Sequence, residues 1–436
     1  MRQQRILLVL FLFFMQAENP FGAAYAQDTL TVEQAVQQVI QNHPAVVQAN
    51  QNIYASEARV LQAETAKLPN AGFDALYTRI GPVPQLYFPG LGDFKLYPEN
   101  NYDAHVGGRY TVYDFGKANA AINAAQSHVQ SARDAVEMTK SGLAYQTIRT
   151  FYAILFLEKS IHVTDEQIEA LSQHLQTTQK KVESGTATSF DVLTTQVRVA
   201  AAQNQKIELE NALHQQQIAL HQLLGVSAEQ QVELRGEFLM TPVSLNTDSL
   251  VQKAFAQREE LKLARDAEQS AELQYKTVSF GALPSLQVNL AYGVKNGYIP
   301  NLDVLRGNWV AGVQLQVPIY EGSRTDHQEE EAHANILAEQ AHVNDTQRQV
   351  RSDVERAVSD IRAALDKLQI SNLQVEQAKE AVSIARKRYE TGSVTNLDLL
   401  DAETAESAAQ LGNAQSLYNY VLSVYELKRA TGEMLF

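Results

Sequence analysis

The sequence predicts an α+β membrane protein made of two tandem repeats, each a strand pair followed by a long helical hairpin. Proline is absent from residues 99–241 and 319–436, so long helices can occupy both stretches. The glycine-containing segment 184–193 has a close copy at 391–400. Segments in which apolar and polar residues alternate, which is typical of strands, lie next to the start of each proline-free stretch. The chain therefore repeats one supersecondary unit.

The first 26 residues have the pattern of an export signal. Basic Met1–Arg5 is followed by an apolar run over 6–15 and by the small-residue end Ala24-Tyr25-Ala26. Signal peptides show these three parts in this order, and cleavage follows the small residues. We therefore expect residues 1–26 to be a signal peptide and the rest of the chain to leave the cytoplasm.

Composition excludes several classes of protein and site. The formal net charge is −14, whereas nucleic acids and anionic membrane surfaces attract clustered lysine and arginine. The chain has no cysteine, which excludes disulfides, thiolate metal sites, a cysteine nucleophile and an acylated cysteine. No apolar run of transmembrane length follows the signal, so we expect no membrane-spanning helix.

The first repeat is expected to span residues 27–225. The alanine- and glutamine-rich segment 118–130 favours helix. A helix over 116–182 would extend roughly 100 Å and would need a partner along its length. The expected elements are strands near 70–80 and 101–113, and helices at 116–182 and 188–224.

A connecting segment, 226–248, is expected to lead into the second repeat, 249–436. This repeat has the same order of elements. They are strands near 284–296 and 308–320, and helices at 322–390 and 395–431.

The four strand segments favour a membrane-facing sheet. In the third, Leu286, Val288, Leu290, Tyr292 and Val294 alternate with mostly polar residues. Each segment has about 11 residues, the length of a tilted membrane strand. An expected aromatic belt lies near the strand ends, at Tyr102, Tyr113, Trp309 and Tyr320. A half-buried sheet in a soluble domain remains the alternative interpretation.

The two copied segments are predicted to be turns between antiparallel helices. Gly185 and Gly392 allow the backbone to leave a helix. Thr188 and Thr395 follow at positions suited to capping the next helix. Asp191 would then lie in the first turn of the first of these helices, and Asp398 in that of the second, where the helix dipole favours a carboxylate.

Several short motifs accompany this order of elements. They are Asn42-His-Pro-Ala-Val46, Leu68-Pro69, Leu283-Pro284, Val112-Tyr-Asp-Phe-Gly116, Val317-Pro-Ile-Tyr-Glu-Gly322 and Leu223-Leu-Gly225. With the two turns, they resemble the TolC-like outer-membrane efflux proteins over nearly the whole mature chain.

The resemblance implies a homotrimer in which four strands per chain form one 12-stranded β-barrel, continued by a periplasmic α-helical barrel. It implies a passive exit channel of a tripartite efflux pump or type I secretion system. This channel would sit in outer-membrane lipid of a Gram-negative-type bacterium and reach into the periplasm. A periplasmic adaptor and an inner-membrane pump or ABC transporter would open it at its periplasmic tip.

The same resemblance assigns roles to individual residues. Asp398 and Asp401 match the positions that narrow the closed gate, and Tyr389 matches a tyrosine that locks the gate by bonding to the position of Asp191. A second family bond uses an arginine where this chain has Val394, so that part of the lock is expected to be missing or rebuilt. The adaptor-docking tips would be Ser184, Gly185, Thr186, Thr391, Gly392 and Ser393.

Two other functions are weighed against the channel. An exported coiled-coil scaffold or adhesin would use the long helices to space its partners, and fractionation would distinguish it because only the channel should need detergent. An exported enzyme is disfavoured because no HExxH, GxSxG, GxGxxG or phosphate-loop pattern occurs. We therefore expect no enzymatic activity, no cofactor, no metal and no nucleic-acid partner.

Overall fold

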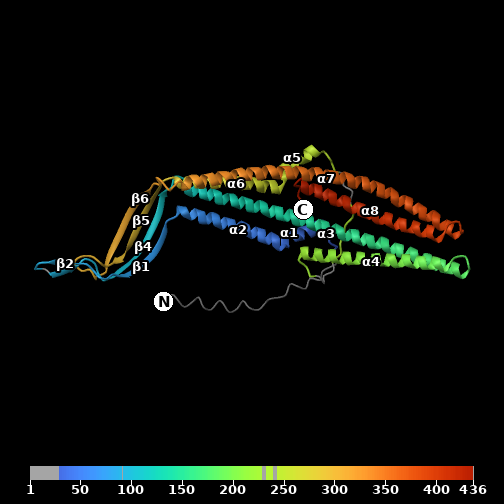
Figure 1. Ribbon diagram of the computed structural model, residues 1–436, viewed down its shortest axis with the longest axis horizontal. Coiled ribbons are helices and arrows are strands. Elements are labelled where there is room, and N and C mark those ends of the chain that lie inside the picture. Colours follow the sequence, from blue (N-terminus) through green and yellow to red (C-terminus); the bar gives the residue numbers. More distant parts are fainter. Residues whose placement is uncertain (1–28, 91, 228–231, 239–242, 436) are drawn as a thin grey trace, which may run out of the picture.

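The computed structural model describes residues 29–90, 92–227, 232–238 and 243–435. The expected signal peptide lies outside these residues, as do parts of the expected connecting segment. Long helices form an extended body, with a four-stranded sheet at one end and two helical turns at the other (Figure 1).

The two halves of the chain contain the same succession of helices and sheet strands. The first half contains α1 (Val32–Asn42), α2 (Pro44–Glu64), β1 (Asn70–Arg79), β2 (Gln85–Phe88), β3 (Gly92–Lys95), β4 (Asn100–Tyr113), α3 (Lys117–Glu183) and α4 (Ser189–Leu224). The second contains α5 (Thr247–Gln257), α6 (Glu259–Ser279), β5 (Ser285–Lys295), β6 (Arg306–Gln316), α7 (Arg324–Glu390) and α8 (Asn396–Ala430). Both α3 and α7 have 67 residues. The small β2–β3 hairpin occupies the loop between β1 and β4.

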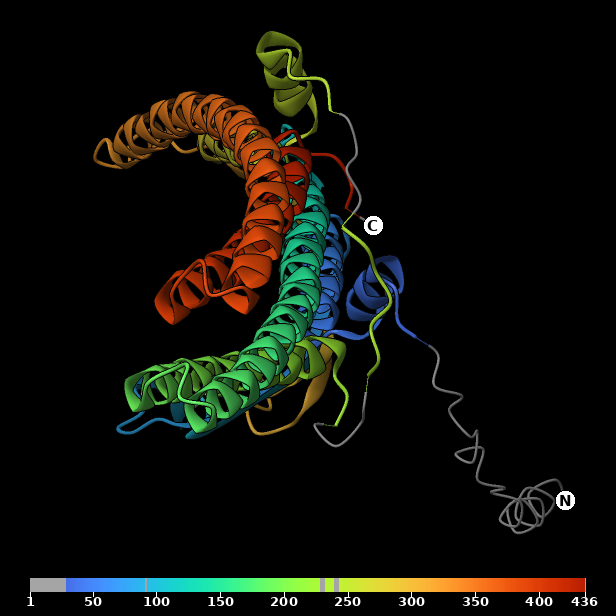
Figure 2. The ribbon, with the colours of Figure 1, turned by 90° about the vertical axis from the view of Figure 1, so that its right-hand side faces the viewer.

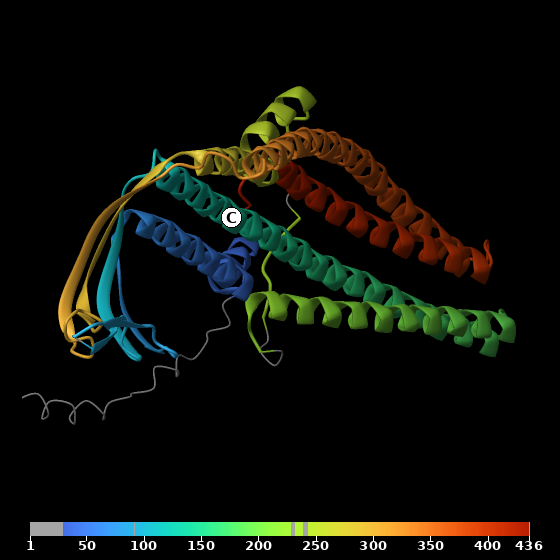
Figure 3. The ribbon, with the colours of Figure 1, turned by 60° about the vertical axis from the view of Figure 1, so that its left-hand side comes forward.

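Each of the two longest helices packs against two shorter helices in succession. α2 lies beside α3 near the sheet and α4 lies beside it toward the turns; α6 and α8 do the same for α7 (Figures 1 and 3). The hairpin helix α4 has 36 residues and cannot cover the 67 residues of α3. The hairpin helix alone is therefore not the full-length partner that the sequence requires. An apolar stripe needs packing partners over its whole length, and α2 and α6 supply the rest.

The main hydrophobic core lies in the middle of the molecule. Phe151 of α3, Leu223 of α4, Ile361 of α7 and Leu427 of α8 are all buried there. Helices α1 and α5 lie in the middle of the long axis (Figure 1) and on the outside of the helical body (Figure 2), and they add their apolar faces to the same core. Toward the turns a much smaller cluster contains Leu171, Ala202 and Leu400. Apolar burial thus holds the middle of the helical body more strongly than its end.

The sheet joins the two halves in the order β1-β4-β5-β6, with every pair antiparallel. The strand expected over 308–320 is observed as β6, which ends at Gln316. Tyr320 therefore lies beyond the strand rather than at its end. The physical reason is Pro318, whose missing N–H and fixed φ do not suit a continuing ladder.

Among the described residues, no helix contains an apolar stretch long enough to cross a bilayer.

A buried arginine ties the α5–α6 junction to the second helical hairpin. The Arg258 side chain is 6% exposed and makes two bonds to Glu260, at 2.7 and 3.1 Å. It also donates to Asp353 of α7 at 3.2 Å and to the carbonyl oxygen of Ala430 at the end of α8 at 3.3 Å. One guanidinium therefore satisfies groups from three helices.

We expect Arg258→Leu to destabilise the folded chain by about 3–5 kcal/mol, because it removes a donor from the buried Ala430 carbonyl and leaves the largely buried Asp353 carboxylate with the more distant, exposed Arg356. The measurement is the midpoint of thermal unfolding of the purified protein. Arg356→Leu is the control, since the Arg356 side chain is 69% exposed and lies 3.9 Å from the same aspartate. Equal midpoints for the two variants would contradict this role of Arg258.

Candidate functional site

The two helical turns are built alike. Gly185 has φ 76° and Gly392 has φ 71°, in the left-handed region that glycine adopts without strain. In the first turn Thr186 N–H donates to the carbonyl of Lys181 at 2.8 Å. In the second Ser393 N–H donates to the carbonyl of Arg388, also at 2.8 Å. Such bonds close helix ends by pairing their free carbonyls.

The helix that follows each turn begins with a capping box. The Thr188 hydroxyl accepts from Asp191 N–H while the Asp191 carboxylate accepts from Thr188 N–H. Thr395 and Asp398 make the same reciprocal pair. The predicted caps at Thr188 and Thr395 are thus confirmed.

Tyr389 lies at the contact between the two hairpins, where its residue is 7% exposed. Its hydroxyl lies 3.2 Å from Thr178 Oγ1 on α3. Lys181 Nζ donates to the carbonyl oxygen of Tyr389 at 2.7 Å and also lies 3.8 Å from the centre of its ring. The His174 ring lies 5.0 Å from the tyrosine ring. The end of α7 is therefore held to α3 by two hydrogen bonds, a cation–π contact and an aromatic contact.

The structure places Asp191 differently from the expected lock. Its carboxylate bonds Thr188 N–H at 2.8 Å and the Thr188 hydroxyl at 2.7 Å, so it is used within its own helix cap. The Tyr389 hydroxyl is paired with Thr178 instead. Asp191 still reaches the other hairpin through its carbonyl oxygen, which accepts from Asn396 Nδ2 at 3.3 Å. Because the helix cap already uses the Asp191 carboxylate, this group does not bond to the Tyr389 hydroxyl.

The two expected gate aspartates have different partners. Asp398 is exposed, and its bonds from the Thr395 hydroxyl and N–H lower the pKa of its carboxyl below the usual range. Asp401 lies one turn further along α8 and pairs with Arg198 of α4 at 3.1 Å. The structure therefore links Asp401 to the other hairpin, whereas the exposed Asp398 carboxylate is used in the cap of its own helix.

The sequence reasoning missed the α3 residues that meet Tyr389 and α8. His174 Nε2 lies 2.6 Å from Asn396 Oδ1, and both side chains are buried. Thr178 Oγ1 lies 3.4 Å from the same amide oxygen. A sequence signal existed, because Leu171, His174 and Thr178 recur at the three- and four-residue spacing of one helix face. That spacing does not indicate which helix the face meets.

The adaptor-docking candidates lie in the turns themselves. Ser184 and Thr186 are exposed and hydrogen-bond to each other at 3.0 Å, and Thr391 pairs with Ser393 in the second turn at 3.1 Å. Both turns are at the end of the molecule farthest from the sheet (Figure 1). Their surface is therefore open to contact.

The sheet exposes a continuous apolar face across all four strands. Phe73 of β1 pairs with Val106 of β4, which pairs with Tyr292 of β5, which pairs with Trp309 of β6. Directly paired residues point to the same side of a sheet. All four side chains are more than half exposed in a single chain. An apolar patch of this extent marks a surface that contacts lipid or protein.

The opposite face of the sheet is polar. Arg109 Nε donates to Asn289 Oδ1 at 3.2 Å across β4 and β5, and His105 Nδ1 lies 3.2 Å from Asp103 Oδ1. The apolar face is thus matched by a hydrated one.

The expected belt residues lie at two levels of the sheet. Tyr102 and Trp309 lie near the loop end, where Tyr102 contacts Tyr77 with ring centres 5.1 Å apart. Tyr113 ends β4 on the helical side, and Tyr320, also on that side, is 83% exposed. Their role as a membrane belt stays a prediction.

We expect Tyr389→Phe to weaken the contact between the hairpins by roughly 0.5–1.5 kcal/mol, because it removes one buried hydrogen bond. A double-mutant cycle with Thr178→Val, read out by thermal unfolding, isolates this bond. The double variant should lose less free energy of unfolding than the sum of the losses in the two single variants. A parallel cycle with Asp191→Ala should show no coupling, and strong coupling there would restore the pairing first expected.

Within the described ranges, no cluster of three or more histidine, aspartate or glutamate side chains could hold a metal ion.

Comparison with known proteins agrees with this architecture. The outer membrane efflux protein family matches residues 35–226 and 250–433. "Outer membrane protein TolC" of Escherichia coli is 21% identical over 413 residues, which cover 92% of this chain and 82% of that protein. "Alkaline protease secretion protein AprF" of Pseudomonas aeruginosa is 24% identical, covering 78% and 72% of the two chains.

Solved structures share the fold. The CmeC outer membrane channel of Campylobacter jejuni superposes with a TM-score of 0.79 at 15% identity, over 92% of this chain and 85% of that one. The outer membrane protein VceC of Vibrio cholerae gives 0.77 at 19% identity, over 93% and 97%. Since the matched regions cover most of both halves, the chain belongs to the outer membrane efflux protein family.

Proposed function

We propose that this protein is the passive exit duct of a tripartite efflux pump or type I secretion system, formed by three copies of the chain. The observation that carries the proposal is the open four-stranded sheet with one continuous apolar face and two unpaired edges, β1 and β6.

The trimer follows from the requirements of lipid. An unpaired strand edge in hydrocarbon leaves its N–H and C=O groups unsatisfied, at a cost of several kcal/mol for each group. Four strands are too few to close a barrel, whereas three chains supply twelve. β6 of one copy would pair with β1 of the next, with the apolar face toward lipid and the polar face toward the lumen.

The helical turns would form the periplasmic gate. Three copies would bring Asp398 and Asp401 together around the axis. There the repulsion between carboxylates would raise the pKa of Asp398, whereas the cap lowers it. Arg198 would neutralise part of this ring through Asp401. The lock would be rebuilt from Tyr389, Thr178 and Lys181. The lysine would supply the positive charge that an arginine supplies in the family and that Val394 lacks here.

Energy and cargo selection would come from partners. The turns would dock a periplasmic adaptor, which would join the duct to an inner-membrane pump or ABC transporter. We propose no enzymatic role for this chain. The names of relatives such as AprF and "Proteases secretion protein PrtF" of Dickeya chrysanthemi point to secretion as one use of such a duct.

The function is tested by recording single channels of the purified protein in planar bilayers. The wild type should give a small, stable conductance, and Asp398→Ala/Asp401→Ala should increase it because the charged constriction is lost. Asp360→Ala/Asp366→Ala is the matched control, since both aspartates are exposed on α7 far from the turn. Native mass spectrometry should show a trimer. A monomer without conductance would reject the proposal.

A further inference from the structure

A buried carboxyl, Glu403, lies where α8 packs against α3; we call this contact between the two hairpins the hairpin seam. One hydrogen bond lies on each side of Glu403 along the seam. Gln167 Oε1 accepts from the Ser407 hydroxyl at 2.7 Å, and His174 Nε2 lies 2.6 Å from Asn396 Oδ1. The Glu403 side chain is only 5% exposed.

This carboxyl is only half satisfied. Oε1 accepts from Arg386 at 3.2 Å, whereas Oε2 is buried and has no hydrogen-bond partner among the described residues. The Arg386 side chain is 54% exposed, so water screens much of its charge. An ionised carboxylate with an unpaired buried oxygen is costly, and protonation removes the charge. The closed seam therefore favours neutral Glu403.

Titratable groups from three helices act on this carboxyl or line the cavity beside it. They are His174 and Glu166 from α3, Lys379, Arg386, Lys387 and Glu390 from α7, and Glu406 from α8. Burial has the largest influence and raises the pKa of Glu403, and Glu406 adds to this rise. His174 and Arg386 act in the opposite direction without reversing it.

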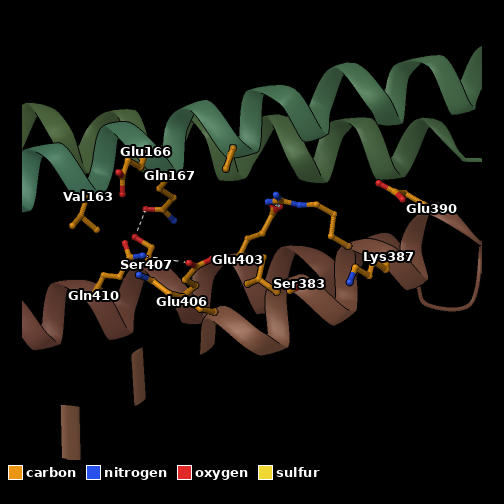
Figure 4. A pocket seen from close by; sticks show the side chains of 14 residues that line it. Val163, Glu166, Gln167, Ser383, Lys387, Glu390, Glu403, Glu406, Ser407 and Gln410 are labelled. Carbon is orange, nitrogen blue, oxygen red and sulfur yellow. Dashed lines mark hydrogen bonds and ion pairs between the residues drawn. The ribbon is translucent and has the colours of Figure 1, made fainter. Parts of the chain in front are cut away.

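The seam is suited to separation. Near the turns most side chains beside it are polar, with the apolar Val163, Ala170 and Val382 among them, and the hydrophobic cluster found at this level in the described residues has three buried members, Leu171, Ala202 and Leu400. A cavity of about 690 Å³ opens beside it between α3, α7 and α8, with Gln167, Ser407 and Glu403 on its wall (Figure 4). Water would reach Glu403 as soon as the hairpins part.

We propose that Glu403 is a proton-sensitive latch: when protonated it keeps α8 against α3, and when ionised it favours separation of the two hairpins. The inference rests on the proposed function only for its consequence, which is a wider duct after separation. It does not require the trimer, because every group involved belongs to one chain.

The sign of the pH dependence follows from linkage. In the separated seam water solvates the carboxyl, and its pKa returns toward the ordinary value of 4.5; in the closed seam it is higher. The closed seam therefore binds the proton more tightly. The latch holds fully below about pH 4.5 and is released as the pH rises through the higher value, with a change of at most about tenfold per pH unit.

The test measures the distance between the hairpins by electron spin resonance. The chain lacks cysteine, so Gln176→Cys on α3 and Ile384→Cys on α7, both exposed, can be spin-labelled selectively. In the full-length protein in detergent, the fraction with long distances should rise between pH 4.5 and 8. Glu403→Gln, which is neutral at every pH, should keep the short distance throughout.

Two further variants make the result decisive. Arg386→Gln should move the transition to higher pH, because it removes a positive charge that favours the carboxylate. His174→Gln should retain the transition. Three results would overturn the latch. The distance could be independent of pH in the labelled parent, the transition could persist in Glu403→Gln, or it could disappear only in His174→Gln. This experiment measures no conductance, so its result does not depend on whether the protein forms a channel. The channel assignment is tested separately by the single-channel recordings.

Discussion

Val313→Arg is expected to prevent most of the protein from assembling in the outer membrane. Val313 lies near the middle of β6 on the apolar face and is 71% exposed in the single chain. An arginine on the lipid face near the bilayer midplane costs about 2–4 kcal/mol. In a trimer this cost would arise three times. The measurement is the fraction of protein that stays with outer membranes after urea extraction.

The neighbouring residue provides the matched control. Gln314 pairs with Gln287 on the opposite, polar face, where an arginine would meet water. Gln314→Arg should therefore assemble nearly as well as the wild type. If the control failed and Val313→Arg assembled normally, the two faces of the sheet would be assigned the wrong way round.

The second large effect is expected for Lys181→Met. Methionine keeps an unbranched apolar side chain against the Tyr389 ring but loses the ammonium that donates to the Tyr389 carbonyl at 2.7 Å. Hydrogen bonds to charged groups contribute about 1.5–3 kcal/mol. We therefore expect the ratio of closed to open channels to fall roughly ten- to hundredfold, as measured by the open fraction in single-channel recordings.

Lys180→Met is the control for this prediction. Lys180 is adjacent in sequence and exposed, so the variant removes the same charge from the turn without touching Tyr389. Equal changes in both variants would show that net charge, rather than the contact of Lys181 with Tyr389, stabilises the closed state.

Local features were readable from the sequence because their causes are local. The absence of proline predicted the long helices, and α3 begins and ends within one residue of the expected range 116–182. Period-two alternation located the strands, and Pro318 explains why β6 stops early. The caps at Thr188 and Thr395 depend only on residues three apart.

Contacts between distant segments were harder to predict. Asp191 was expected to meet Tyr389, yet its carboxylate had a nearer partner in its own cap. Thr178, Lys181 and His174 carry no motif, and they became visible only when α3 was placed beside α7 and α8. The sequence does not single out Glu403, because its burial is a property of the packed helices.

The sequence by itself determined the four strands of the main sheet, the four helices of the two hairpins and the turns between them, and that the pattern occurs twice, because these depend on neighbouring residues and their spacing. Only the tertiary structure decided the order β1-β4-β5-β6, the two-stage support of α3 and α7, and the groups that meet in the hairpin seam. The physical reason is that periodicity shows which face of an element is buried, whereas the partner of that face is selected by packing over the whole chain.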